Sequence, residues 1–161
     1  MPRRYWLLLV FALAAGSAWA ETLTGKVTSV ADGDTLTLTV NAGQRFTIRL
    51  AGIDAPEKAQ PFGTAAAKHL SARVLNRIAD VEFHKQDRYG RLVGKVVVDG
   101  VDVNLEQVRA GLAWHYKDYQ SEQTVADRRL YAAEEQTAKA AGRGLWGEPE
   151  PIPPWKWRKA R

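Results

Sequence analysis

The stretch TLTLTVNAGQRFTIRL at residues 35–50 decides the fold, because it contains two runs in which apolar and polar residues alternate. The apolar residues of the two runs are Leu36, Leu38 and Val40, followed by Phe46, Ile48 and Leu50. Alternation with a period of two predicts strands that are buried on one face. The segment Asn-Ala-Gly at 41–43 favours a turn between them, so the stretch predicts a β-hairpin.

The sequence before and after this hairpin predicts three further strands and three helices. The strands are predicted at 22–30, 81–85 and 92–98, and an Asp-Gly turn follows the last of them at 99–100. The helices are predicted at 62–78, 103–110 and 122–141.

Local signals set the ends of these helices. In the first helix Ala66, Leu70, Val74 and Ile78 recur every four residues, which is typical of one apolar helix face. Gly111 ends the second helix, and Ser121 is the expected N-cap of the third.

The order of these elements predicts an α+β, β-rich fold. Five short antiparallel strands, one helix inserted after the third strand and two helices at the end are typical of a small closed β-barrel, and the OB-fold is the common five-stranded case. We therefore expect an OB-fold five-stranded β-barrel with three helices.

Composition bounds the function before any motif is considered. The 161 residues leave room for one sizeable domain, and 45% hydrophobic with 25% charged residues is ordinary for a globular protein. The formal net charge of +5 favours polyanionic partners such as nucleic acid. The chain has no cysteine, which excludes disulfides, thiolate zinc sites, iron–sulfur clusters and cysteine nucleophiles. Any bound metal must therefore have oxygen or nitrogen ligands.

Residues 1–20 have the pattern of a secretory signal peptide. Arg3 and Arg4 precede an apolar run at 7–15, and Ala18-Trp19-Ala20 matches a cleavage site before Glu21. We predict an exported protein, periplasmic or secreted, that is cleaved after Ala20. An uncleaved membrane anchor is the alternative, although the apolar run is short for a span of about 20 residues. We expect no stable membrane association.

After the leader, residues 21–147 are expected to form the folded domain, and 148–161 a Pro-rich basic C-terminal extension. Four prolines, at 149, 151, 153 and 154, exclude regular structure up to Pro154. The following segment Trp-Lys-Trp-Arg-Lys mixes aromatic rings and cations. It is compatible with contact to nucleic acid or membrane, and equally with packing of its tryptophans onto the barrel.

Two acidic motifs lie at strand ends. Asp32-Gly33-Asp34-Thr35 precedes the first hairpin strand, where an ordinary turn is the alternative interpretation. The segment RLAGIDAPE at 49–57 follows the second strand. Pro56 restricts the backbone of the residue before it, so Asp54 and Glu57 lie on a stiffened segment. A solvated loop is the alternative here.

A third motif, DRYGR at 87–91, is predicted to be a hairpin turn. Gly90 permits a positive φ, and the charged residues around it include Arg91. The alternative is a charged surface turn without a function.

Together, in this order and with these spacings, the three motifs resemble the thermonuclease (staphylococcal nuclease-like) family. The resemblance covers residues 23–147 and includes VRAGLA at 108–113 and Gly-Leu-Trp at 144–146. It implies an OB-fold barrel with helices. It also implies a metal-dependent phosphodiesterase, an endonuclease that cleaves DNA and RNA as substrates, usually with Ca²⁺.

The resemblance also implies roles for individual residues. Asp34 and Asp54 match the metal-binding carboxylates, and the main-chain carbonyl of Ala55 matches a further ligand. Glu57 matches the general base that activates water, and Arg49 and Arg91 match the phosphate-binding pair. Ala55 stands where the best-known members have Thr, so a carbonyl ligand is kept but a hydroxyl is lost.

Chemistry explains why these residue types belong together. Two carboxylates about 4 Å apart repel by about 4 kcal/mol at an effective dielectric of about 20, so a site that joins Asp34 and Asp54 needs a cation. Oxygen ligands in irregular geometry favour Ca²⁺ over Mg²⁺, and other divalent ions stay possible. A carboxylate such as Glu57 is able to take a proton from water, and guanidinium forks suit phosphate oxygens where negative charge builds up.

Strand parity does not by itself bring the site together. It places Asp34 in phase with Leu36 and Arg49 opposite Ile48, so their convergence rests on the resemblance.

Weaker candidates for substrate binding are Tyr89, Tyr116 and Tyr119. The resemblance implies that such tyrosines stack on bases or bond a phosphate, and a core or surface role is the alternative. The three histidines, His69, His84 and His115, have no ligand-like spacing and are interpreted as structural or solvated.

A functional alternative is a non-catalytic OB-type module that binds single-stranded nucleic acid or a protein. Such a module needs no acidic residues beside the phosphate path. We expect the protein to be a monomer.

Overall fold

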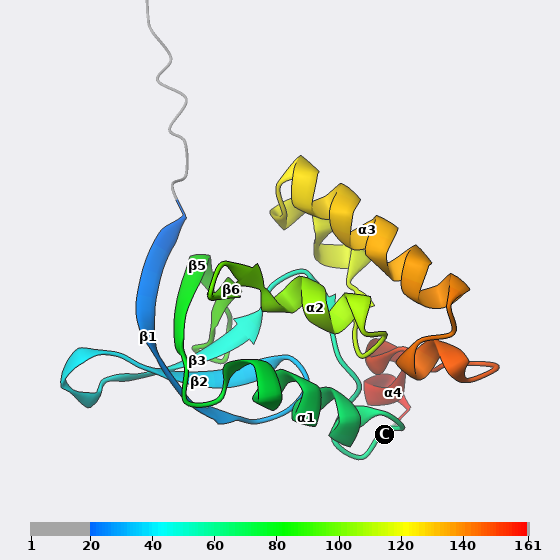
Figure 1. Ribbon diagram of the computed structural model, residues 1–161, viewed down its shortest axis with the longest axis horizontal. Helices are drawn as coiled ribbons and strands as arrows, with labels where there is room; N and C mark the ends of the chain where they lie inside the picture. The colour runs from blue at the N-terminus through cyan, green and yellow to red at the C-terminus, as the bar shows by residue number, and fades with distance from the viewer. Residues whose placement is uncertain (1–19, 161) are drawn as a thin grey trace, which may run out of the picture.

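Five strands close into a β-barrel in the computed structural model, which describes residues 20–160 (Figure 1). The strands are β1 (Glu21–Val30), β2 (Thr35–Thr39), β3 (Arg45–Leu50), β5 (Ile78–Gln86) and β6 (Leu92–Val98), joined in the order β3-β2-β1-β5-β6. The barrel closes where β3 pairs with β6, with Ile48 opposite Leu92 and Leu50 opposite Gly94. The predicted barrel of the OB-fold type is confirmed. Its closing pair, β3 with β6, is parallel, so the prediction that all five strands are antiparallel is wrong for this pair.

The predicted leader at residues 1–20 lies outside the described residues except for Ala20. The described chain begins its first strand at Glu21.

The hairpin of β2 and β3 has the register that the alternation predicts. Leu36 pairs with Ile48 and Leu38 with Phe46. Leu36, Leu38 and Ile48 are fully buried. A short 3-10 turn, η1 (Asn41–Gly43), joins the strands and ends on Gly43 at φ 79°. The two small strands β4 (Ile53–Asp54) and β8 (Trp114–His115) pair with each other, and β7 (Val101–Asp102) extends the sheet beside β6.

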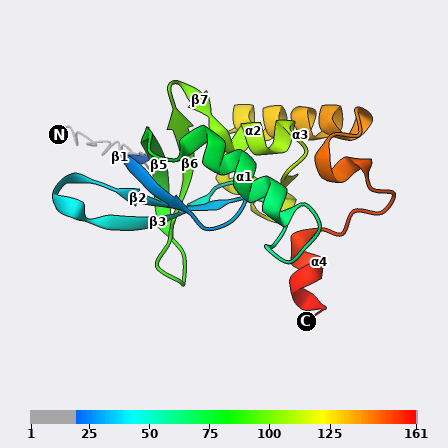
Figure 2. The same cartoon turned by 60° about the horizontal axis from the view of Figure 1, so that its bottom comes forward.

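Three helices lie side by side along one side of the barrel, with α2 (Val103–Arg109) between α1 (Gly63–Val74) and α3 (Val125–Ala140) (Figures 1 and 2). A fourth short helix, α4 (Pro154–Lys159), lies in the extension. In both views α4 lies on the side away from the tip of the β2–β3 hairpin. It begins at the last of the four prolines, a position where proline suits a helix start. The remaining short segments are η2 (Lys117–Glu122) and η3 (Gly144–Gly147).

Two predicted helix boundaries are wrong. The first helix ends at Val74, because Asn76 has φ 63° and its N–H pairs with the Val27 carbonyl, so the chain turns toward β1. Ile78, predicted on the apolar helix face, instead begins β5 and is 60% exposed. The third helix begins at Val125, capped by the side chain of Thr124, and Ser121 lies in η2.

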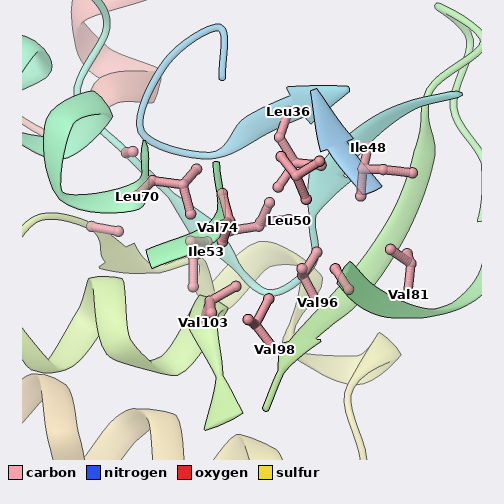
Figure 3. Packing of buried hydrophobic residues seen from close by; sticks show 14 of the residues in the cluster. Leu36, Ile48, Leu50, Ile53, Leu70, Val74, Val81, Val96, Val98 and Val103 are labelled. Carbon is pink, nitrogen blue, oxygen red and sulfur yellow. The ribbon is translucent and has the colours of Figure 1, made fainter. Parts of the chain in front are cut away.

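The core fills the space between the inner faces of the strands and the helices α1 and α2 (Figure 3). Leu70 and Val74 of α1 and Val103 of α2 are buried there with strand residues such as Leu50 and Val96. Burial of each such side chain stabilises the fold by about 1.5–3 kcal/mol relative to exposure.

A buried asparagine ties the core to the segment after β3. Asn104 donates from Nδ2 to the carbonyls of Ala51 (3.0 Å) and Gly94 (3.1 Å), and its Oδ1 accepts from the Val96 N–H (3.1 Å). Because residues 51–54 carry the chain into β4, this network helps to position Asp54.

Candidate active site

All nine residues predicted from the sequence line one cleft of about 720 Å³. They are Asp34, Arg49, Asp54, Ala55, Glu57, Tyr89, Arg91, Tyr116 and Tyr119. They come from the bend before β2, the end of β3, β4 and the loop after it, the β5–β6 hairpin, and the segment around η2. The fold therefore brings together residues up to 85 positions apart, as the ends of several strands meet at one place.

The Asp34 carboxylate is nearly buried and is fixed on two sides. Oδ1 accepts from the Thr35 hydroxyl (3.1 Å), and Oδ2 accepts from the Ala55 N–H (2.7 Å). Gly33 allows this close approach, because a Cβ there would lie 2.6 Å from the Cβ of Ala66 and 2.7 Å from that of Ala55. Asp34 lies in the bend before β2, so the strand alternation does not set its direction.

Asp54 is the most deeply buried acid of the cleft, at 1% exposure. The pairing of β4 with β8 places it opposite Trp114. Burial raises the pKa of the Asp54 carboxyl above its ordinary value, although a hydrogen bond from Arg158 and the charge of Arg49 oppose the rise. A buried carboxylate of this kind needs positive charge beside it to stay ionised.

Arg49 joins the two acids. Its Nη1 donates to the carbonyls of Leu50 (2.8 Å) and Ile53 (2.9 Å), which fixes the plane of the guanidinium. Its Nη2 lies 3.2 Å from Asp34 Oδ2 and 3.0 Å from Asp54 Oδ1. Both carboxylates thus converge on one cationic atom.

This convergence fits a small hard cation. Oxygens from Asp34 and Asp54 already approach one positive centre, and oxygen donors suit Ca²⁺ and similar ions. Within residues 20–160 no group of three or more His, Asp or Glu side chains is arranged to hold a metal ion. A cation here would therefore depend on two carboxylates together with main-chain oxygen and water. Burial, with the neighbouring Asp34 charge, raises the pKa of Asp32 to about 6.

Glu57 lies at the edge of the cleft on a fixed loop. Its N–H donates to Gln60 Oε1 (3.1 Å), and its carbonyl accepts from the Gln60 N–H (2.8 Å). The carboxylate is 37% exposed and accepts from Arg158 Nη1 at 2.8 Å. It is accessible to solvent while close to Asp54, which shares the same arginine.

Arg91 is held by the hairpin turn that contains it. Asp87 accepts from the N–H groups of Tyr89 (2.9 Å) and Arg91 (3.0 Å) and from Arg91 Nε (2.8 Å). Gly90 takes φ 80° in this turn. Within residues 20–160 Asp87 accepts only from Nε of this guanidinium, so the group is oriented while its two terminal nitrogens stay available to a ligand.

The predicted tyrosines lie around the rim. Tyr116 contacts Tyr119 edge to face, with ring centroids 4.9 Å apart. Tyr89 is 68% exposed on the opposite hairpin, beneath the guanidinium of Arg88. Their partial exposure is compatible with contact to a ligand.

Sequence reasoning missed Arg158 as a residue of the cleft. Its Nη1 lies 3.2 Å from Asp54 Oδ1, and its Nη2 lies 2.9 Å from Asp54 Oδ2. No spacing signal connects positions 54 and 158. The aromatic residues of the extension gave the only hint, since packing onto the barrel was one of its two interpretations. The structure shows that packing: Trp155 stacks on Tyr116 at 5.2 Å and 9°.

Glu135, a buried acid outside the cleft, holds the chain at residues 115–117 in place. Glu135 accepts from the His115 N–H (3.0 Å) and pairs with Lys117 and Lys139. Burial acts to raise the pKa of Glu135, but the hydrogen bond and charge of Lys117, the charge of Lys139 and the His115 N–H together lower the pKa below its ordinary value. His115 is itself buried and bonded to Gln123 at 2.7 Å, as expected for a structural histidine.

Residues 20–160 contain no helix with the length and apolar character that a membrane span requires.

Comparison with known proteins gives one family. Residues 47–148 match the family model described as "Staphylococcal nuclease homologue". The matched range begins in β3 and ends after η3, so it includes most of the cleft but not Asp34 or residues 149–161.

Individual relatives agree with this match. The chain is 37% identical over 153 residues to an "Uncharacterized endonuclease" of Haemophilus influenzae, covering 95% of this chain and 82% of that protein. It is 34% identical over 160 residues to a "Micrococcal nuclease" of Shigella flexneri, covering 94% and 88%. A probable staphylococcal-like nuclease of Oryza sativa subsp. japonica is 39% identical over 117 residues, which are 72% of this chain and 33% of that protein.

Proposed function

This chain belongs to the staphylococcal nuclease homologue family and is a nuclease, and we propose that it cleaves DNA and RNA with a divalent cation held at Asp34 and Asp54. Nucleases of this family are metal-dependent in general, and the choice of ion and of residues is our proposal. The observation that carries it is the convergence of the two carboxylates on Arg49 Nη2 inside one cleft.

Calcium is the ion that we propose. The available donors are two carboxylates and main-chain oxygen such as the Ala55 carbonyl, a mixed set that Ca²⁺ tolerates better than Mg²⁺ does. The Ala55 N–H bond to Asp34 supports this assignment, because it holds the Ala55 main chain beside the first carboxylate. The side chain of residue 55 contributes no hydroxyl.

The protein side chains have separate tasks in the proposed hydrolysis. When bound, the cation would polarise the phosphate and lower the pKa of water. Glu57 accepts the proton of the attacking water as the new bond from oxygen to phosphorus forms. The bond from phosphorus to the leaving oxygen then breaks, and that oxygen takes a proton from solvent.

Arg49 and Arg91 supply the positive charge on the substrate side. Negative charge builds up on the equatorial phosphate oxygens during the reaction, and a preoriented guanidinium stabilises it without reorganising. Both guanidinium groups are preoriented here, Arg49 by two carbonyls and Arg91 by Asp87. Tyr89, Tyr116 and Tyr119 would contact bases or sugar at the rim.

Export is also proposed. It rests on the charge, apolar run and cleavage pattern of residues 1–20.

The alternative from the sequence, a non-catalytic binding module, is tested directly by substrate integrity. Purified protein with Ca²⁺ is incubated with end-labelled single-stranded DNA and with RNA, and the products are separated on a denaturing gel. We expect shortened strands with both substrates. Intact strands that are retarded on a native gel would instead identify a binding module.

A further inference from the structure

The C-terminal helix α4 contributes Arg158 to the lining of the cleft, where this side chain contacts Asp54 and Glu57. We propose that Arg158 competes with the divalent cation for the carboxylate of Asp54, so that binding of the cation releases Arg158. This inference rests on the proposed function.

The contacts of Arg158 occupy the oxygens that a cation would need. Its two terminal nitrogens reach both oxygens of Asp54, at 3.2 and 2.9 Å, and Nη1 also reaches Glu57 at 2.8 Å. Asp54 Oδ1 is shared with Arg49, so neither oxygen of this carboxylate is without a cationic partner. A cation is able to reach the buried Asp54 only if at least one of these partners moves.

Of the two arginines, Arg158 is the one that is free to move. Arg49 is 15% exposed and is braced by two main-chain carbonyls. Arg158 is 43% exposed, and within residues 20–160 its hydrogen bonds are those to the two acids. A divalent ion at Asp54 would repel both guanidinium groups. Arg158 is the more exposed of the two, so its ion pairs contribute less free energy, and moving it into water costs less.

The helix has an attachment that does not depend on Arg158. Trp155 stacks on Tyr116 and meets Trp114 edge to face at 5.5 Å. Gln60 Nε2 donates to the Ile152 carbonyl at 2.5 Å. These contacts keep α4 docked and hold the guanidinium near the acids at high local concentration, which makes it an effective competitor.

The consequence is a lower apparent affinity for the cation. If Arg158 is bonded to the acids about 90% of the time, the apparent dissociation constant rises about tenfold, because only the open fraction accepts the ion. In return, Asp54 and Glu57 stay neutralised when no ion is bound.

Isothermal titration with Ca²⁺ tests the competition on four proteins: wild type, Arg158→Gln, Arg158→Lys and Lys156→Gln. Lys156 is exposed on the same helix, so its replacement removes the same charge from the extension without touching the acids. We expect Arg158→Gln to bind Ca²⁺ about tenfold more tightly than wild type, and Lys156→Gln to match wild type. Arg158→Lys is expected to lie in between, because lysine keeps the charge but cannot span both oxygens.

A second readout follows the release of Arg158 itself. Trypsin cleaves after a lysine or arginine only when the side chain is accessible, and mass spectrometry separates cleavage after Arg158 from cleavage after Lys156. We expect Ca²⁺ to increase the ratio of the first to the second in the wild-type protein. Taking the ratio cancels any effect of Ca²⁺ on trypsin.

The outcomes separate this inference from the proposed function. If wild type binds Ca²⁺ and cleaves DNA, but the affinity of Arg158→Gln is unchanged or weaker, the competition is refuted and the nuclease assignment stands. A constant cleavage ratio with and without Ca²⁺ would also refute it. Absence of Ca²⁺ binding by all the proteins would overturn both the cation assignment and the competition.

Discussion

Replacement of Arg49 by lysine separates charge from geometry in the proposed mechanism. Arg49 makes four contacts: Nη1 with two carbonyls at 2.8 and 2.9 Å, and Nη2 with Asp34 and Asp54 at 3.2 and 3.0 Å. A lysine ammonium is a single point and cannot occupy both positions. Arg49→Lys therefore keeps one positive charge but loses the fixed fork.

The expected effect falls mainly on turnover. Loss of one preoriented donor that acts where charge develops costs about 10²–10³ in turnover. Affinity for single-stranded DNA is expected to fall less than about tenfold, because attraction to phosphate depends on charge and only weakly on the fork. Loss of the two bonds to main-chain carbonyls lowers the free energy of unfolding by about 1–3 kcal/mol.

Three measurements on one preparation of each protein check these three expectations. They are steady-state turnover with Ca²⁺, DNA binding by fluorescence anisotropy without Ca²⁺, and urea unfolding. Arg45→Lys is the matched control, because Arg45 is exposed at the other end of β3. It is expected to behave like wild type in all three. Equal losses of affinity and turnover in Arg49→Lys would refute the argument and indicate that Arg49 only anchors phosphate.

Three further predictions concern the base, the support behind the cleft and the loop of Asp34. Glu57→Gln keeps size but removes basicity, so turnover should fall by about 10²–10⁴ with little change in Ca²⁺ affinity; recovery of the rate at high Ca²⁺ would show a metal ligand instead. Glu135 has a lowered pKa, so its stabilisation is present above the ordinary value of 4.5 and is lost as pH falls; urea unfolding should show the advantage of wild type over Glu135→Gln shrinking below that pH, and a constant difference would contradict this. Gly33→Ala should destabilise the protein by about 1–3 kcal/mol and reduce turnover, since its Cβ would collide with Ala66 and Ala55; an unfolding curve and rate equal to wild type would exclude that tight packing.

The sequence pattern predicted correctly those parts of the fold that depend on residues close together in the chain. The alternation in 35–50 predicted both the hairpin and its inward side chains, because Leu36, Leu38 and Ile48 need only the neighbouring strand and the core. The same reasoning extended the first helix to Ile78, since a four-residue period does not register the positive φ of Asn76 or its bond to Val27.

The alternation and spacing of residues did not predict how the side chains of the cleft come together. Strand parity predicted that the side chains of Asp34 and Arg49 do not meet. They meet because Asp34 lies in a bend before β2, and because the guanidinium of Arg49 reaches past the end of β3. The resemblance supplied their association, and the aromatic residues of the extension were the only sequence signal for the place of Arg158. Its place depends on the stacking of Trp155 on Tyr116, a contact between segments 39 positions apart.

We propose that Asp34 and Asp54 hold a divalent cation on which cleavage depends. The most direct measurement is the rate of single-stranded DNA hydrolysis by wild type and Asp34→Asn, each with Ca²⁺ and with EDTA, beside Asp80→Asn as an exposed control on β5. Asparagine keeps an acceptor for the Ala55 N–H, and circular dichroism checks that the variant is folded. We expect hydrolysis by wild type and Asp80→Asn only with Ca²⁺, and almost none by folded Asp34→Asn. Undiminished hydrolysis in EDTA, or a folded Asp34→Asn with the wild-type rate, would contradict it.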